Sequence, residues 1–518
     1  MTVREQLNSI AEKRILILDG AMGSVIQTLN LDEKGYRGNM FIDHPQPLYG
    51  CNDLLCLTRP GAIGAIHDTY LEAGADIIET CSFNAASIKL ADYGIGHLSY
   101  DISAAAARIA RKSADKFSTD DNPRFVAGSI GPTSKSASLG ETGWDELENS
   151  YYNNARGLLD GGVDIFIIET VSDPINAKAA LRAINKLLEE RRIDTPVIIS
   201  ASVSDDGRLH SGQTLEAFLI SIQHISPNRM PWAVGLNCSF DAPEILPHLR
   251  ALSEIAPCLV SAYPNAGPKN KYGRYDETPE RVAEDIEQFF KEGLVNIIGG
   301  CCGSTPAHID AIADKAAGFT PRKIPDIQSP EIFSGIETFH IENNIVRLKT
   351  GEDGEIVNVE ADDEQTINSL LDGALANRYK VKVPFYISSR ETNVLRAGLK
   401  RLQGRSFAGP INLKNGEQEF LQKAKIIQSY GAAAVITLID EQCADSSDTG
   451  NTGAANEENQ RKLEIAMRIY RLLHEIGYFT DSIVFDLNVE KISPELPPEE
   501  NKIYAWIKDN CPGALIAL

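Results

Sequence analysis

Three of the nine cysteines have positions in the sequence that could bring their sulfur atoms together at one point. Cys301 and Cys302 are adjacent and flanked by glycines in GGCCGS, and Cys238 follows the apolar run AVGLN. Neighbouring residues of a strand point to opposite sides, so both members of the pair can face one point only if the backbone bends, which glycine permits. Three thiolates fit tetrahedral Zn²⁺, and a site with only three protein ligands leaves a fourth position for a substrate.

A site made of sulfur ligands suits a substrate that also binds through sulfur. A metal ion lowers the pKa of a bound thiol, which is about 8.5 when free, and so produces a nucleophilic thiolate near neutral pH. The reaction class suggested is alkylation of a thiol. The alternative is that each cysteine is a small core residue, and we assign that structural role to the remaining six. These are Cys51, Cys56, Cys81, Cys258, Cys443 and Cys511.

Eight short apolar runs recur in the first 310 residues and are separated by spacers long enough for a helix. None alternates with a period of two, which is typical of parallel strands covered on both faces. Eight such units favour a closed (β/α)8 barrel, the TIM barrel. The runs are 15–20, 76–81, 125–131, 164–170, 196–202, 233–239, 259–267 and 295–302.

Polar residues gather at the carboxyl ends of these predicted strands. In a barrel those ends share one face, and active sites form there. Glu79 and Glu169 have an alternative reading as surface or loop-anchoring acids. The residues concerned are Asp19, Glu79, Glu169, Asn237, Cys238, Asn265, Cys301 and Cys302.

Composition narrows the class of protein. The chain has 518 residues and a formal net charge of −22, without a basic, aromatic-rich block, which argues against nucleic-acid binding. No run of 18 apolar residues indicates a membrane span. An odd number of scattered cysteines favours reduced thiols over disulfides, so we expect a cytoplasmic protein.

Several segments together resemble the homocysteine-binding barrel of zinc-dependent homocysteine S-methyltransferases. Within that family, the chain is most similar to the N-terminal half of cobalamin-dependent methionine synthase. The resemblance covers about residues 10 to 325. Its segments are DGAMGS at Asp19, ETCSFN at Glu79, the ET..D pattern at Glu169, GLNCS at Cys238, YPNAG at Tyr263 and GGCCGS-P at Gly299.

The resemblance implies a role for most of the site residues. Cys238, Cys301 and Cys302 would bind Zn²⁺, the homocysteine sulfur would take the fourth position, and Asn265 sits where the family can close the empty site. Asp19 and Glu169 match the acids that hold the substrate's ammonium group. Glu79 matches a pocket residue without an assigned role. The turn that can offer backbone N–H groups to the substrate carboxylate comprises Gly20, Ala21 and Gly23.

A smaller, incomplete barrel-like α/β domain is expected after the first barrel. We place the barrel at residues 1–325, a polar linker at 326–352 and the second domain at 353–518, with five or six strand candidates. The second domain resembles the methyltetrahydrofolate-binding barrel of the same synthases.

The second domain departs from that folate-binding pattern at its strand ends. The chain has Asn358-Val359-Glu360 and Ser388-Ser389-Arg390 where the pattern has other residues. The acid that would bind a pterin is therefore lost, and we expect no folate binding.

The sequence does not determine the identity of the methyl donor. No D-x-H-x-x-G pattern, which would ligate cobalamin, occurs in the chain. If methylcobalamin is the donor, a separate corrinoid protein must carry it, and this is the leading hypothesis. One alternative is a homocysteine methyltransferase that uses a small donor such as betaine or S-methylmethionine. Another is a non-catalytic partner of a corrinoid protein.

Overall fold

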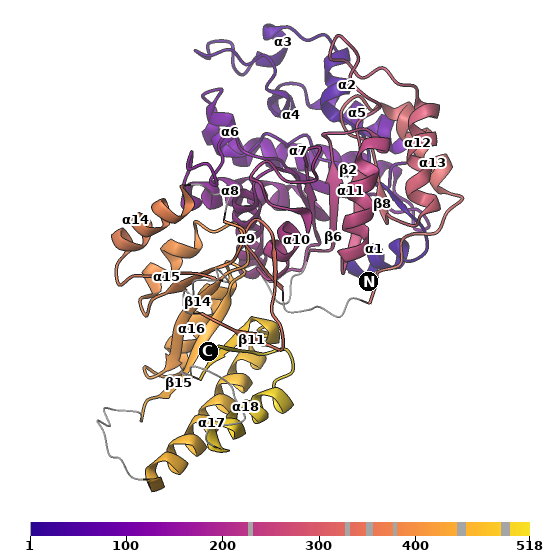
Figure 1. Cartoon of the computed structure of the whole chain (residues 1–518). Coiled ribbons are helices and arrows are strands. Elements are labelled where there is room, and N and C mark those ends of the chain that lie inside the picture. The colour runs from indigo at the N-terminus through magenta and orange to yellow at the C-terminus, as the bar shows by residue number, and fades with distance from the viewer. Residues whose placement is uncertain are drawn as a thin grey trace. The chain divides into compact units, whose positions relative to one another are not determined.

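The computed structural model describes residues 2–225, 231–326, 332–348, 356–376, 381–442, 452–487 and 498–517. The chain divides into two compact units (Figure 1). The first comprises residues 1–211 and 231–327, and the second comprises residues 212–230 and 328–518. None of the described helices is long and apolar enough to cross a membrane.

The first unit is built around a parallel sheet of eight strands. Each strand overlaps one of the eight predicted runs, and only β4 extends beyond its run, by one residue, so the barrel prediction is confirmed. Most strand residues are buried, in agreement with the absence of alternation in the sequence. The strands are β1 (Leu16–Ile17), β2 (Ile77–Glu79), β3 (Phe125–Ile130), β4 (Ile165–Val171), β5 (Val197–Ala201), β6 (Ala233–Asn237), β7 (Leu259–Tyr263) and β8 (Ile297–Ile298).

The sheet closes on itself between its first two strands. The strand order is β1-β8-β7-β6-β5-β4-β3-β2. A parallel bridge joins Leu18 to Ile77, and the Asp76 N–H donates to the Ile17 carbonyl at 2.8 Å. Inward-facing apolar side chains fill the barrel, so its interior is a packed core.

Helices surround the barrel, and several begin at a proline or at a capping side chain. Asp173 accepts from the Ile175 N–H at 2.8 Å, and Thr278 accepts from the Arg281 N–H at 3.3 Å. The helices of this unit are α1 (Val3–Ala11), α2 (Met22–Thr28), α3 (Glu33–Arg37), η1 (Asn52–Leu54), α4 (Leu55–Thr58), α5 (Pro60–Glu72), α6 (Ser87–Ala91), η2 (Gly96–Leu98), α7 (Ser99–Phe117), α8 (Trp144–Gly161), α9 (Pro174–Arg191), α11 (Ala242–Ile255), α12 (Pro279–Lys291) and α13 (Pro306–Ala316).

The second unit contains a parallel sheet of seven strands and a two-stranded hairpin. The seven strands follow the order β11-β17-β16-β15-β14-β13-β12, in which the first strand of the sheet lies beside the last, as in the barrel. No pairing joins β11 to β12 among the described residues, which agrees with an incomplete barrel. The strands are β9 (Ile332–Ser334), β10 (Thr338–His340), β11 (Ile345–Val346), β12 (Val357–Glu360), β13 (Phe385–Ser388), β14 (Phe407–Leu413), β15 (Ala433–Asp440), β16 (Ile483–Asp486) and β17 (Leu515–Ala517).

The helices of the second unit include one from the chain between β5 and β6. This helix, α10, packs against β9, where the Thr214 N–H donates to the Ile336 carbonyl at 2.9 Å. The helices are α10 (Leu215–Gln223), α14 (Glu364–Leu375), α15 (Thr392–Leu399), α16 (Glu417–Gln428), α17 (Thr452–Glu475), η4 (Thr480–Ser482) and α18 (Pro498–Asn510).

The second sheet has seven described strands, whereas the sequence predicted five or six, and β14 and β11 were the hardest to predict. The sequence of β14 contains Gly409 and Pro410, which argue against a central strand, but the pairing register with β15 shifts between Ala408 and Ile411 and accommodates them. The other strand, β11, is only two residues long and pairs with β17. It lies in the stretch expected to be the linker, as does the β9–β10 hairpin.

Candidate metal centre

The three predicted cysteines come together at the carboxyl end of the barrel. One ligand atom of each of Cys238, Cys301 and Cys302 lies within 4.8 Å of the others, and the Sγ atoms of Cys238 and Cys302 are 3.8 Å apart. Among the described residues, this is the one such group of His, Cys, Asp or Glu ligand atoms. The spacing along the chain and the barrel topology therefore produce one cluster.

The backbone bends at each of the two segments that supply the sulfurs. Cys238 and Ser239 adopt left-handed conformations, with φ of 59° and 56°. Both Cys301 and Cys302 lie beyond the end of β8, and Gly303 turns the chain with φ of 84°. A Cβ at Gly303 would lie 2.2 Å from the Tyr275 Cβ, so glycine is required there for space as well as for conformation.

Backbone and serine hydrogen bonds hold this turn in place. The Cys301 N–H donates to the Pro264 carbonyl at 2.8 Å, and the Cys302 carbonyl accepts from the Ala266 N–H at 2.9 Å. Ser304 Oγ donates to the Cys301 carbonyl at 2.6 Å and accepts from the Ala21 N–H at 3.0 Å. The sequence prediction missed Ser304 as a positioning residue, although it directly follows GGCCG.

The electrostatics of the cluster fit a cation. Hydrogen bonds from the thiols of Cys238 and Cys301 lower the pKa of Cys302 to about 3, and the charge of Lys269 contributes. Contacts with Cys238 and Cys302, together with burial, raise the pKa of Cys301 well above its ordinary value. The neighbouring thiols thus oppose ionisation of all three sulfurs at once, and a bound cation would favour it.

Three predicted carboxyl groups lie together near the cysteines. Asp19 follows β1, Glu79 ends β2, and Glu169 lies in β4. Asp19 Oδ2 accepts from the Glu79 N–H at 3.1 Å, and Glu169 accepts from the Ser129 hydroxyl. Asp19 and Glu169 are buried and Glu79 is half-buried.

Burial and mutual repulsion perturb these acids strongly. Burial raises the pKa of Glu169 to about 7. Burial and the charge of Glu169 raise the pKa of Asp19 and of Glu79 well above their ordinary values. No described lysine, arginine or histidine contributes to these shifts, and Asp19 Oδ1 and Glu79 Oε1 are buried without a hydrogen-bond partner. The three acids therefore suit a cationic group on a ligand.

Asn265 and the segment with Gly20, Ala21 and Gly23 also border the cluster. Asn265 is buried, its N–H donates to the Phe240 carbonyl at 3.0 Å, and its Oδ1 has no partner. The turn that contains Gly20, Ala21 and Gly23 leads into α2, and its Ala21 N–H already donates to Ser304. A Cβ at Gly20 would lie 2.8 Å from Ser304 Oγ, so this glycine allows the close approach.

Asn237 links β6, which ends just before Cys238, to β4, which carries Glu169. Its Oδ1 accepts from the Thr170 N–H at 3.0 Å and from the Ser200 hydroxyl at 2.7 Å, and its Nδ2 donates to Thr170 Oγ1 at 2.8 Å. Thr170 has a φ of 55°, which is unusual for a β-branched residue. Asn237 therefore sets the position of Glu169 relative to Cys238.

A cavity of about 210 Å³ adjoins Glu169. One wall is the loop 131–141, which is held by Asp173, the residue before α9, and by Asn176, in the first turn of α9. Asp173 accepts from the Ser138 N–H at 2.9 Å, and Asn176 Oδ1 accepts from the Ala137 N–H at 3.1 Å. A cavity of this size, beside a carboxyl group, suits a molecule as small as an amino acid.

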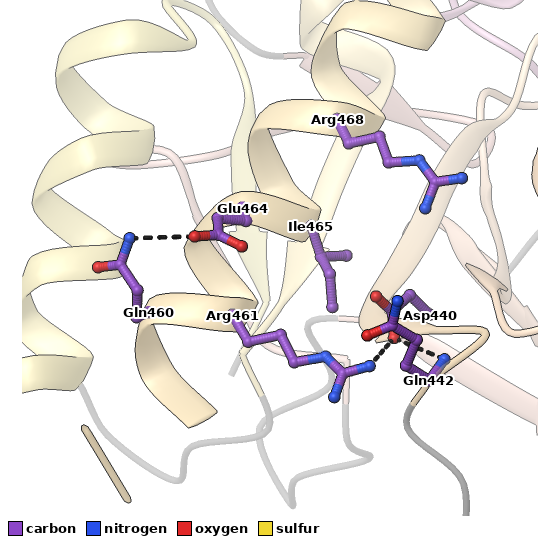
Figure 2. A pocket seen from close by; sticks show the side chains of 7 residues that line it. All are labelled: Asp440, Gln442, Gln460, Arg461, Glu464, Ile465 and Arg468. Carbon is purple, nitrogen blue, oxygen red and sulfur yellow. Dashed lines mark hydrogen bonds and ion pairs between the residues drawn. The ribbon is translucent and has the colours of Figure 1, made fainter. Parts of the chain in front are cut away.

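The second unit contains a pocket at the carboxyl end of β15, with a volume of about 550 Å³ (Figure 2). Its charged groups are paired within the protein. Arg461 contacts Asp440 at 2.5 Å, and Arg468 contacts Glu417 at 2.7 Å and Glu441 at 3.1 Å. The absence of folate binding stays a prediction for this unit.

The sequence model of the homocysteine S-methyltransferase family matches residues 16–316, which include all eight strands of the barrel. The chain belongs to the homocysteine S-methyltransferase family. The family match supports homocysteine as the substrate and methylation of its sulfur as the reaction.

Solved structures that are similar to this chain include two forms of the homocysteine methyltransferase MmuM from Escherichia coli. The metallated form is 22% identical with a TM-score of 0.48, and the match covers 60% of this chain and 99% of that chain. The oxidized form is 22% identical with a TM-score of 0.46, and the match covers 58% of this chain and 96% of that chain. Neither likeness is close enough to bear on the activity of this family member.

Proposed function

We propose that this chain methylates homocysteine with Zn²⁺ held by Cys238, Cys301 and Cys302. The observation that carries the proposal is the convergence of three cysteine ligand atoms within 4.8 Å beside two buried acids, Asp19 and Glu169, and the half-buried Glu79. A soft, all-sulfur set fits Zn²⁺, and three protein ligands leave one position for a substrate thiol. When bound, Zn²⁺ supplies the Lewis acidity that keeps this thiol deprotonated at neutral pH.

The protein's own residues hold and orient the amino-acid part of the substrate. We assign the carboxyl groups of Asp19 and Glu169 to the ammonium group, since the new charge pair would stabilise their ionised forms, which burial disfavours. Asn265 Oδ1, which has no partner, lies beside the cluster and is available to the site. We assign Glu79 to the same acidic wall because its N–H binds Asp19.

The methyl transfer itself needs an in-line approach of the donor. The homocysteine sulfur uses a lone pair to form the new S–CH₃ bond, the bond between the methyl group and the donor breaks, and its electron pair leaves with the donor. The thiol proton has already passed to solvent. Our leading donor is methylcobalamin carried by a corrinoid protein, a hypothesis that rests on the resemblance of the chain to cobalamin-dependent methionine synthase. We expect the cytoplasm as the compartment.

The decisive experiment supplies the zinc-loaded full chain with homocysteine and one donor at a time. The donors are methylcobalamin, methyltetrahydrofolate, betaine and S-methylmethionine, and methionine is measured. We expect methionine from methylcobalamin and not from the others. Turnover with betaine or S-methylmethionine would replace the donor assignment, and failure with every donor, despite bound zinc, would favour a non-catalytic partner of a corrinoid protein.

A further inference from the structure

A tyrosine that the sequence analysis did not select lies against the metal centre. Tyr275 belongs to the connection 264–278, which leads from β7 to α12. A Cβ at Gly303 would collide with the Tyr275 Cβ and would lie 2.8 Å from its Cγ. Because Gly303 directly follows Cys302, the base of the tyrosine side chain packs on the backbone that presents this cysteine.

The hydroxyl group of Tyr275 interacts with a sulfur of the cluster. The side chains of Tyr275 and Cys302 share a hydrogen bond. A tyrosine hydroxyl has an ordinary pKa of about 10, so it carries its proton at neutral pH and can donate. A thiolate has no proton to give and can only accept. In the ionised cluster, the Tyr275 hydroxyl is therefore the donor and the Cys302 sulfur is the acceptor.

A lysine side chain lies over the ring of the same tyrosine. Lys269 Nζ is 5.6 Å from the centre of the Tyr275 ring, within the range of a cation–π contact. A cation at this place draws electron density from the ring and makes the hydroxyl a stronger donor. Tyr275 thus contacts a cation through its ring and a sulfur through its hydroxyl.

The chain on both sides of Tyr275 is held by hydrogen bonds. Two residues later, the Glu277 carbonyl is contacted by His308 Nε2 at 3.1 Å. On the other side of the loop, Asn270 Nδ2 donates to Asp276 Oδ2 at 2.8 Å. The fold therefore brings Tyr275 to the cluster before any metal ion or substrate binds.

We infer that Tyr275 is a positioning residue of the metal centre, whose hydroxyl donates a hydrogen bond to the Cys302 sulfur in its thiolate form. Three protein thiolates and the substrate thiolate together carry more negative charge than Zn²⁺ neutralises. A hydrogen bond to one ligand sulfur offsets part of this excess, as partners of metal ligands commonly do. The inference rests on the proposed function, since it assumes that the three cysteines hold Zn²⁺.

A role in packing alone would need only the ring. Phenylalanine fills the same space beside Gly303 and keeps the face that Lys269 contacts, but it has no hydroxyl group to donate. Tyr275→Phe therefore separates the hydrogen bond from the packing. The chain also offers a matched control, because Tyr272 lies on the same connection and is 75% exposed.

The first test measures zinc affinity by competition of the full chain with a chromophoric chelator. Tyr275→Phe should bind Zn²⁺ about tenfold or more weakly than the wild type, because loss of a ligand's hydrogen-bond partner commonly costs about 10–100-fold. Tyr272→Phe should bind it as the wild type does. An affinity of Tyr275→Phe within twofold of the wild type, or an equal loss in Tyr272→Phe, would overturn the inference.

The second test observes the sulfur directly in the chain loaded with Co²⁺. The thiolate-to-cobalt charge-transfer band should move to longer wavelength in Tyr275→Phe, since a sulfur without its hydrogen bond gives up electron density more easily. The band should not move in Tyr272→Phe. If Tyr275→Phe unfolds at a lower urea concentration while its band stays in place, the tyrosine has a packing role only, and the inference is wrong.

The failure of this inference differs from that of the proposed function. If the wild-type chain binds no zinc, both are wrong. If the wild type binds zinc and methylates homocysteine, and Tyr275→Phe keeps the wild-type zinc affinity and cobalt band, only the role of Tyr275 is wrong.

Discussion

Asn237→Ala is expected to weaken homocysteine binding and to destabilise the barrel while the cysteine cluster keeps its metal ion. Asn237 is almost fully buried and makes three hydrogen bonds with Thr170 and Ser200. Without it, the left-handed Thr170 loses the partner of its N–H, and the neighbouring Glu169 carboxyl group is free to shift. Cys238 keeps its own N–H bond to the Tyr263 carbonyl at 3.3 Å.

The magnitude follows from the groups left without partners. A buried amide N–H without an acceptor costs about 1–3 kcal/mol, and two hydroxyl groups lose a partner but can rotate to another. We expect the free energy of unfolding to fall by about 3 kcal/mol. A hydrogen bond to a charged group contributes about 1.5–3 kcal/mol, so loss of most of the ammonium contact with Glu169 should raise KM for homocysteine by about tenfold or more.

The assay combines urea unfolding, zinc content and steady-state kinetics. The matched control is Asn154→Ala, which removes another buried amide, bonded to Ser103 Oγ at 3.0 Å on the outer helices. It should lower stability without changing KM. If Asn237→Ala kept KM within twofold and the free energy of unfolding within about 0.5 kcal/mol, the assignment of Asn237 as a positioning residue would be refuted.

Three further changes test other parts of the structure. Cys302→Ala should reduce bound zinc below one ion per chain and abolish methyl transfer, and full activity without zinc would disprove the metal assignment. Burial raises the pKa of Glu169 from 4.5 to about 7, so the metal-free protein should lose stability as the pH rises through this window. Glu169→Gln should remove that loss, and its free energy of unfolding at pH 8 should be about 3 kcal/mol higher than that of the wild type, although it binds homocysteine more weakly. A variant no more stable than the wild type would contradict the cost of burying the ionised carboxyl group. Arg405→Met should cost about 3 kcal/mol, because Arg405 is 1% exposed and pairs with the half-buried Asp481 at 3.2 Å. A loss under 1 kcal/mol in urea unfolding would speak against this pair.

The barrel and the cysteine cluster could be predicted because their signals are local or depend on topology alone. Continuous apolar runs identify strands covered on both faces, and eight of them with helical spacers favour one closed sheet. Closure then brings the ends of β6 and β8 near each other, so Cys238 meets Cys301 and Cys302 although more than sixty residues separate them. The second unit was predicted less completely, since β11 is too short to form a pattern and β14 contains a proline.

The sequence by itself determined the eight strands of the barrel and which sulfurs lie at its carboxyl end, because periodicity and strand order depend on residue type and chain order. Only the tertiary structure decided that α10 belongs to the second unit, that Asn237 braces Thr170, and that three acids share one wall without a described cation. These features depend on distances between segments far apart in the chain. Hydrogen bonding and desolvation act over such distances and leave no periodic trace in the sequence.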